Sequence, residues 1–284
     1  MIKIENSHFS IEQICESGQC FRIYKQEAGK YRVTALGNYL EIINKEEGTF
    51  FDCTEEEYLT LWKHYFDLET DYQLFFKGVT EKDGYLFRAM QYGSGIRILN
   101  QELWEVVISF IISQQNNIKR IRRSIELLCT RFGEKALTKE GKEYYLFPTP
   151  EALLTASEVE LTECNLGYRG RYIRRTAESI VNREVDLAKI KKLDYQGAKT
   201  ELLKLYGVGN KVADCICLFA LHQLEAFPVD THINKVLEEH YPEGFPFKAF
   251  EGFSGVLQQY LFFYDLKKGG DMKGRKAKTA FPTK

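Results

Sequence analysis

The sequence predicts an α+β fold in which an N-terminal antiparallel β-sheet domain is followed by a helical body. Short strand-like segments separated by turn residues precede Glu55, and helical periodicity runs through the chain from that residue onward. The composition, 44% hydrophobic and 28% charged, is that of a globular protein and excludes a disordered or collagen-like chain. A length of 284 residues favours about two domains. We place them at 1–98 and 99–266, before a basic tail at 267–284 that we expect to be flexible.

The predicted sheet is a meander of short strands at 29–36, 38–44 and 48–53. Turn residues, Gly37-Asn38 and Glu46-Glu47-Gly48, separate these segments, as expected for antiparallel neighbours. From Glu55 the apolar residues recur at helical spacing instead. The first fifty residues therefore read as strands, and the next segment reads as a helix.

The helices of the predicted body follow one another with short connections. Residues 103–113 are apolar on most sides and should be buried, whereas residues 118–132 carry one apolar stripe and end at Gly133. Further helices are expected at 149–156, 157–164, 169–182, 195–205, 211–222, 230–241 and 248–266. We expect no strand after residue 100.

The net charge of −1 conceals an uneven distribution along the chain. Residues 1–100 hold 11 Lys/Arg and 16 Asp/Glu, a net charge of −5, and the remainder holds 28 basic and 24 acidic residues, a net charge of +4. Basic residues cluster at 119–123, 169–175 and 267–284. One such cluster is typical of a solvated helix face, but several in one half of the chain favour a polyanionic partner.

The seven cysteines are scattered and include no CxxC pair, so we expect reduced thiols rather than a disulfide framework. The N-terminus has no apolar signal segment, and the longest apolar stretches, near 106–112 and 215–221, are too short to cross a bilayer. We therefore expect an intracellular protein without a membrane partner, in the cytoplasm or nucleoid if the source is prokaryotic. A monomer is the expected state.

Residues 202–221 form the most informative segment, LLKLYGVGNKVADCICLFAL. Two helical patterns flank Gly207 and Gly209, whose small size allows a tight turn and lets another backbone come close. The start of the second helix would then present main-chain N–H groups to a phosphate. This helix–hairpin–helix pattern, at about 196–222, indicates sequence-independent contact with nucleic acid. A structural corner between two packed helices is the alternative.

Two ionisable residues follow this hairpin. Lys211 lies at the start of the second helix, where the helix dipole disfavours a cation and so favours the neutral amine that a nucleophile requires. Asp230, in the run PVDTH, is an excellent N-cap for the helix that follows. An exposed surface lysine and a purely capping aspartate are the alternatives, although capping and catalysis by Asp230 are compatible.

The segments GVGNKVADCICLFAL and PVDTH resemble the helix–hairpin–helix DNA glycosylase superfamily, and more closely its 8-oxoguanine DNA glycosylase/lyase family. Four more elements are similar to that family: SGQCFR, with Ile23 where the family has tryptophan, SFIISQQNNIKRI, with Gln115 in place of an asparagine, LGYRGRY, and FSGVLQQYLFFYDL. The elements span residues 17–266 in the family's order.

The resemblance implies excision of 8-oxoguanine from duplex DNA followed by strand cleavage. Because chemistry on a base requires that it leave the stack, the nucleotide would be flipped out. Lys211 would attack C1′ and form a Schiff base that leads to β-elimination. Asp230 would stabilise the cationic sugar.

The resemblance also implies which residues bind the base. The main-chain carbonyl of Gly18 would accept a hydrogen bond from N7–H, which 8-oxoguanine has and guanine lacks. Phe262 would stack on the base, Cys215 would face its other side, and Gln258 would contact its Watson–Crick edge. Without the resemblance, Gly18 reads as a turn residue and Phe262 and Cys215 read as core residues.

The remaining implied contacts are with the DNA around the lesion. Tyr168 would wedge into the gap, and Gln115, Arg120 and Arg169 would hold the orphaned cytosine, because cytosine offers acceptors that arginine can meet. Because Gln115 stands where the family has an asparagine, the strictness of that cytosine preference stays open. His232 would lie near the 5′ phosphate. Asn117 would contact DNA or act as an ordinary helix N-cap.

No cofactor is expected. Related glycosylases carry a four-cysteine iron–sulfur loop after the catalytic aspartate, but no cysteine follows Cys217 here, and no zinc-type spacing exists. The resemblance admits a monovalent cation at the hairpin. Two rival functions remain: a glycosylase of the same superfamily with another substrate, such as alkylated purines, and a non-catalytic protein that binds duplex DNA through the hairpin alone.

Overall fold

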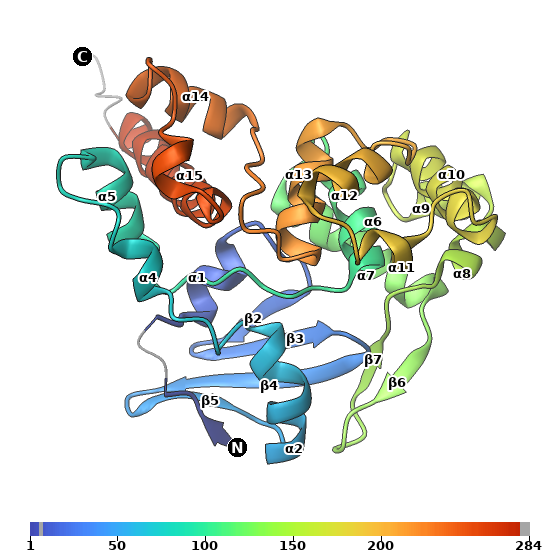
Figure 1. Cartoon of the computed structure of the whole chain (residues 1–284). Coiled ribbons are helices and arrows are strands. Elements are labelled where there is room, and N and C mark those ends of the chain that lie inside the picture. Colours follow the sequence, from blue (N-terminus) through green and yellow to red (C-terminus); the bar gives the residue numbers. More distant parts are fainter. Residues whose placement is uncertain (6–7, 279–284) are drawn as a thin grey trace, which may run out of the picture.

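The computed structural model describes residues 1–5 and 8–278, with side chains through residue 268. A five-stranded antiparallel sheet in the order β1-β5-β4-β3-β2 forms the N-terminal part, at the bottom of Figure 1. Its strands are β1 (Ile2–Lys3), β2 (Ile23–Glu27), β3 (Lys30–Ala35), β4 (Asn38–Lys45) and β5 (Gly48–Phe51). The predicted antiparallel meander is confirmed by β3, β4 and β5, and β1 and β2 extend it at both edges.

A tight turn sets the register of the two central strands. Ala35 pairs with Asn38, and the two residues between them, Leu36 and Gly37, both have positive φ, 52° and 77°. Positive φ at both central residues defines a type I′ turn, and the twist of this turn matches the twist of the flanking strands. Thus the alternating residues of β3 and β4 place Val33, Leu40 and Ile42 in the interior.

A helical layer covers one face of the sheet. It comprises α1 (Ile11–Glu16) and a continuous helical segment made of α2 (Glu55–Glu57), the π-helical turn η1 (Tyr58–Trp62) and α3 (Lys63–Tyr65). The predicted helix from Glu55 is confirmed, and a capping box at Thr54 and Glu57 starts it. The expectation of strands throughout the first fifty residues is wrong at α1, which Ser10 caps and whose Ile11 and Ile14 are fully buried.

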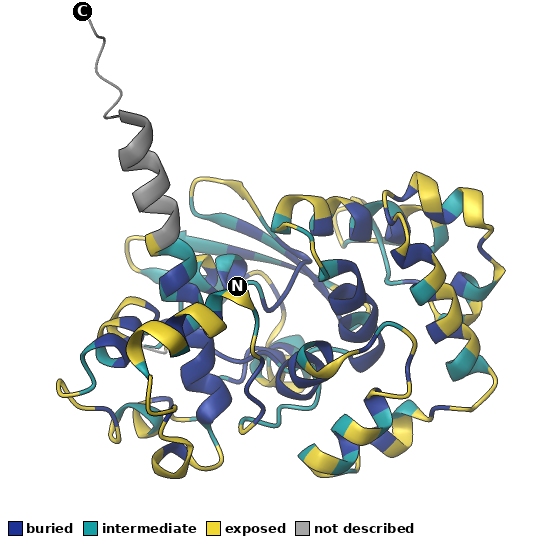
Figure 2. Ribbon diagram, turned by 90° about the horizontal axis from the view of Figure 1, so that it is seen from above, coloured by how far each residue is buried: buried dark blue, intermediate teal, exposed yellow. Residues whose placement is uncertain are grey.

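The helical body fills the rest of the structure. Its helices are α4 (Gln73–Phe76), α5 (Gly84–Tyr92), α6 (Leu103–Ser113), α7 (Ile118–Phe132), α8 (Pro150–Thr155), α9 (Glu158–Glu163), α10 (Arg169–Val181), α11 (Leu187–Ile190), α12 (Tyr195–Leu202), α13 (Asn210–Ala220), α14 (Thr231–His240), the 3₁₀ turn η2 (Phe247–Phe250) and α15 (Ser254–Lys278). The fold class predicted from the sequence is confirmed. Most residues of α6 and α13 are buried, and Figure 2 shows that the buried segments gather in the interior of the molecule while exposed segments lie around its rim.

Two expectations about the body are wrong. Strands β6 (Lys135–Leu137) and β7 (Glu143–Tyr145) form a hairpin after residue 100, and each is too short to show a period of two. The last helix begins at Ser254 rather than 248, because η2 and Gly252 (φ 84°) separate it from Pro246. Helix α15 ends at Lys278, and the flexibility expected of the tail at 267–284 stays a prediction. Residues 279–284 of that tail lie outside the described residues.

Two hydrophobic cores organise these elements. One lies between the sheet and its helical layer, and the other joins the helices of the body. The second core also takes up side chains from Tyr72 to Ile98, because α5 packs on α15. The domain boundary at residue 98 stays a prediction. In the part of the chain that the structure describes, no helix has the length and apolar character needed to span a membrane.

Candidate active site

The predicted hairpin joins α12 to α13. Gly207 has a φ of +86°, and a Cβ at this position would lie 2.7 Å from the Tyr172 ring, so only glycine fits. Gly209 is the N-cap of α13, has no atom within 4 Å of a hypothetical Cβ, and provides no side chain to satisfy the helix N–H groups. The start of α13 is therefore open to a phosphate.

Lys211 extends from the first turn of α13 into a pocket. Its ammonium lies 5.3 Å from the centroid of the Phe110 ring, which stacks on Phe219. Cys215 lies one turn further along α13, and its thiol faces the same pocket. Burial raises the pKa of Cys215 to about 11, although the neighbouring charge of Lys211 acts in the opposite direction. The thiol is therefore neutral at pH 7.

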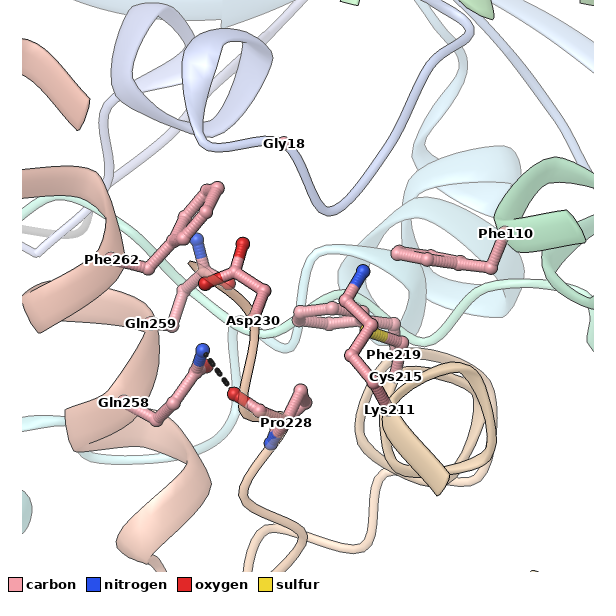
Figure 3. A pocket seen from close by; sticks show the side chains of 10 residues that line it. All are labelled: Gly18, Phe110, Lys211, Cys215, Phe219, Pro228, Asp230, Gln258, Gln259 and Phe262. Atoms are coloured by element: carbon pink, nitrogen blue, oxygen red, sulfur yellow. Dashed lines mark hydrogen bonds between the residues drawn. The ribbon is translucent and has the colours of Figure 1, made fainter. Parts of the chain in front are cut away.

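Asp230 lies on the other side of this pocket, as Figure 3 shows. It caps α14, and its Oδ1 accepts a hydrogen bond from the main-chain N–H of Ile233 at 2.9 Å. The predicted capping role is thus confirmed, and the carboxylate also lines the cavity. Among the described residues, no ion pair within 4.0 Å joins Lys211 to Asp230 or to another carboxylate. An amine and a carboxylate therefore face one cavity without neutralising each other.

The third wall comes from α15. Nε2 of Gln258 donates to the carbonyl of Pro228 at 2.9 Å, whereas its Oε1 is buried without a hydrogen-bond partner in the described structure. A buried unpaired acceptor is costly, so this oxygen is ready for a donor on a ligand. Phe262 contributes an aromatic ring beside it.

Gly18 closes the pocket from the sheet domain. Its φ is +76°, and a Cβ there would lie 3.1 Å from the Phe262 ring. Two buried amides hold the loop: Gln259 donates to the Ser17 carbonyl at 2.7 Å, and Gln19 bonds to Ser17 Oγ, the Arg97 carbonyl and the Leu99 N–H. The loop and α15 are therefore fixed relative to each other.

A larger groove of about 1060 Å³ opens from the pocket. It shares Gly18, Lys211, Asp230 and Phe262 with the pocket, so the two are continuous. Gln115, Asn117, Gly209 and His232, all predicted to contact DNA, also line the groove. Asn117 is the N-cap of α7, and His232 Nδ1 lies 2.8 Å from Asp265 Oδ2.

Four predicted DNA-contacting residues do not line the pocket or the groove: Arg120, Tyr168, Arg169 and Gly207. Arg120 is exposed, as is Tyr168 at 44%. Arg169 is 8% exposed and donates to the carbonyls of Gln114, at 3.0 Å from Nε, and of Gln115, at 3.2 Å from Nη2. Its guanidinium thus holds the loop that presents Gln115, whose φ is +48°. Gln114 in turn donates to the Gly207 carbonyl at 2.9 Å.

Sequence reasoning missed four residues that line the pocket: Phe110, Phe219, Pro228 and Gln259. Gln259 directly follows Gln258, and Pro228 begins the PVDTH run, so each stood beside a predicted residue. The two phenylalanines read as core positions, and only tertiary packing brings them to Lys211. Within the described residues, no three His, Cys, Asp or Glu side chains gather where they could hold a metal ion.

Two protein-family models match consecutive parts of the chain. Residues 1–107 match the family model described as 8-oxoguanine DNA glycosylase, N-terminal domain, and residues 108–244 match HhH-GPD superfamily base excision DNA repair protein. The chain belongs to the 8-oxoguanine DNA glycosylase family. The pocket of this glycosylase lies where its two matched regions meet, with Gly18 from the first and Lys211 and Asp230 from the second.

Two curated relatives and one solved structure support this assignment. The N-glycosylase/DNA lyase of Saccharomyces cerevisiae is 34% identical over 84% of this glycosylase and 70% of the relative. A probable N-glycosylase/DNA lyase of Methanothermobacter thermautotrophicus is 31% identical over 73% of this glycosylase and 74% of the relative. The solved structure is the Clostridium acetobutylicum 8-oxoguanine glycosylase/lyase in complex with double-stranded DNA that contains cytosine opposite 8-oxoguanine. It is 37% identical in sequence, has a TM-score of 0.85, and the match covers 92% of this glycosylase and 93% of that chain.

Proposed function

We propose that Lys211 is the nucleophile and Asp230 the electrostatic catalyst of a bifunctional DNA glycosylase/lyase that removes 8-oxoguanine from duplex DNA. The glycosylase and lyase activities are those of its family. The observation that carries the assignment of roles is the shared pocket, in which an amine and a carboxylate face each other without forming an ion pair. A surface lysine and a merely capping aspartate would not share a cavity with an unpaired buried amide oxygen.

The reaction follows from this arrangement. The neutral amine of Lys211 attacks C1′ of the flipped nucleoside, the C1′–N9 bond breaks, and the base leaves with the bonding electron pair and takes up a proton. The Asp230 carboxylate stabilises the positive charge that develops on the sugar. Ring opening gives a Schiff base between Nζ and C1′. Loss of a proton from C2′ then expels the 3′ phosphate by β-elimination, which cuts the strand.

The pocket walls fit the damaged base. The Gly18 carbonyl would accept a hydrogen bond from N7–H, a donor that undamaged guanine does not have. The unpaired Oε1 of Gln258 would accept one from the Watson–Crick edge. Phe262 and Cys215 would flank the base, and the neutral thiol avoids placing a charge against it. The groove would hold the surrounding duplex, with Asn117, His232 and the open N-terminus of α13 near its backbone.

We further propose cytosine as the preferred opposite base, read by Gln115 and the exposed Arg120 while Tyr168 fills the gap. Arg169 would act by holding the loop of Gln115, since its guanidinium bonds to carbonyls there. We also propose that the enzyme is a monomer. The enzyme would act inside the cell, where its substrate is.

The cation admitted by the resemblance remains a proposal. In the hairpin, the carbonyls of Leu203, Lys204 and Val208 accept no hydrogen bond from the described residues. Carbonyl oxygens suit hard cations, so a monovalent ion held by carbonyls of the hairpin would bridge it to a DNA phosphate. No step of the chemistry requires it.

Borohydride trapping tests the assignment. The enzyme is incubated with a duplex that contains one 8-oxoguanine opposite cytosine, and the covalent adduct is measured by gel shift. We expect an adduct for the wild type, none for Lys211→Gln, and a normal yield for the control Lys199→Gln, whose lysine pairs with Asp214 outside the pocket. An equal adduct for Lys211→Gln would contradict the role. A glycosylase for alkylated purines would give no adduct on this duplex, and neither would a non-catalytic binder.

A further inference from the structure

A row of three tyrosine side chains, exposed at its two ends, links the wedge residue to the hairpin. The Tyr168 ring meets the Tyr172 ring edge to face at 5.4 Å between centroids, and Tyr172 meets Tyr206 in the same manner at 5.1 Å. The two end members are unusually open, with Tyr168 44% and Tyr206 45% exposed. Tyr172 packs against the main core, so the two end rings are held at the surface on a fixed support.

The hairpin end of this row holds an arginine. The Arg175 guanidinium lies 4.5 Å over the centroid of the Tyr206 ring. The neighbouring Thr176 donates its hydroxyl to the Tyr206 carbonyl at 3.0 Å, and Gly207 lets the hairpin backbone lie against Tyr172. Tyr206 is therefore anchored to α10 at both its backbone and its ring. A guanidinium stacked on such a ring is pre-organised for bidentate bonding.

The charge along this face of α10 is not neutralised. Tyr168, Arg171, Tyr172 and Arg175 recur at i, i+3, i+4 and i+7, the spacing of one helix face. Arg171 and Arg175 are exposed, and within the described chain neither has a carboxylate within 4.0 Å. By contrast, Arg131 on α7 pairs with Glu160 and Glu163. An unpaired guanidinium stacked on a tyrosine ring, with the unpaired Arg171 on the same helix face, matches the chemistry of a phosphate-binding surface.

We propose that Arg175, held on Tyr206 and accompanied by Arg171, forms a backbone phosphate-binding site for duplex DNA between the wedge and the hairpin. The inference rests on the proposed function, because the elements at both ends of the row, Tyr168 and the hairpin glycines, are its expected DNA contacts. Since the duplex must pass both ends, the face between them lies along its path. The site reads phosphate rather than sequence, so it strengthens binding to damaged and undamaged duplex alike.

The test compares Arg175→Gln with Arg88→Gln. Arg88 is a matched control, because it is exposed, lies 5.9 Å over the Tyr85 ring, and belongs to α5 at the far end of the molecule from α10 in Figure 1. Fluorescence anisotropy measures the affinity for a lesion-free duplex at 50 and 200 mM salt. Loss of one phosphate contact should make the salt-dependent fall in affinity about 3.5-fold smaller in Arg175→Gln. Tyr206→Leu should weaken binding in the same direction, and Arg88→Gln should match the wild type.

Single-turnover excision at saturating enzyme separates this site from the catalytic pocket. We expect the maximal rate of Arg175→Gln to equal that of the wild type, while the enzyme concentration needed for half-saturation rises. If Arg175→Gln keeps the wild-type salt dependence and differs only in melting temperature, the stack is structural and the inference is wrong. Failure of the wild type to form a borohydride adduct would instead contradict the proposed function, whatever the salt dependence shows.

Discussion

Replacing Asp230 with asparagine separates its helix-capping role from the catalytic role that we propose for it. Its Oδ1 accepts the Ile233 N–H at 2.9 Å and so caps α14, and the same carboxylate faces Lys211 across the pocket. Asparagine caps a helix as well as aspartate does, so Asp230→Asn should change the free energy of unfolding by less than about 0.5 kcal/mol. Alanine has no acceptor, and Asp230→Ala should lower it by about 1 kcal/mol.

The catalytic loss in Asp230→Asn should be much larger. A carboxylate about 4 Å from the sugar cation stabilises it by roughly 4 kcal/mol at the effective dielectric constant of a partly exposed site. Because asparagine keeps the shape but has no charge, single-turnover excision should fall by roughly 10²- to 10³-fold. The duplex still has the groove and the hairpin to bind, so its affinity should change little.

Asp194→Asn is the matched control. Asp194 also caps a helix, accepting from the Gly197 N–H at 2.8 Å, but it does not line the pocket. Its variant should excise 8-oxoguanine at the wild-type rate. Two outcomes would contradict the catalytic role of Asp230. The Asp230→Asn variant could excise 8-oxoguanine as fast as the Asp194→Asn control, or it could be inactive only because it no longer folds.

Three other perturbations follow from the pocket and the hairpin. Gln258→Leu removes the unpaired Oε1, so kcat/KM for 8-oxoguanine should fall by about 5- to 150-fold. It also removes the Nε2 donor of the Pro228 carbonyl, so the variant should unfold at a lower temperature than the wild type, and an unchanged kcat/KM would exclude the contact with the base. Gly207→Ala should lower the free energy of unfolding in denaturant by more than about 1 kcal/mol, because its Cβ would meet Tyr172. Gly209→Ala should unfold like the wild type and weaken only DNA binding. Equal free energies of unfolding for the two variants would contradict this packing. The pKa of Cys215 is raised by burial to about 11, above its ordinary value of 9.0, so the unfolded chain ionises first and this residue's contribution to stability falls as pH rises from 9 to 11. The stability difference between wild type and Cys215→Ala should therefore shrink by roughly 2 kcal/mol over that range, and a constant difference would show that the thiol is not buried in solution.

The sequence revealed those parts of the fold and site that rest on local patterns. Period-two alternation predicted β3 and β4, and the glycine pair predicted the hairpin between α12 and α13. The site residues Lys211, Asp230, Gln258 and Phe262 each belong to a recognisable run, and the fold brings all four to one pocket.

Features that depend on tertiary contacts could not be predicted. Helix α1 is six residues long, and β6 and β7 are three residues each, so none of them repeats its period often enough to be recognised in the sequence. Arg169 lies in a basic cluster typical of a solvated face, yet its guanidinium is buried against the carbonyls of Gln114 and Gln115. No local signal separates an arginine that binds DNA from one that braces a loop.

The central claim is that the amine of Lys211 bonds to the sugar. Mass spectrometry of the borohydride-reduced adduct, after nuclease and protease digestion, tests it most directly because it identifies the modified residue. We expect a reduced sugar remnant on the peptide that contains Lys211. A remnant on the N-terminal amine, or on a groove lysine such as Lys119, would contradict it.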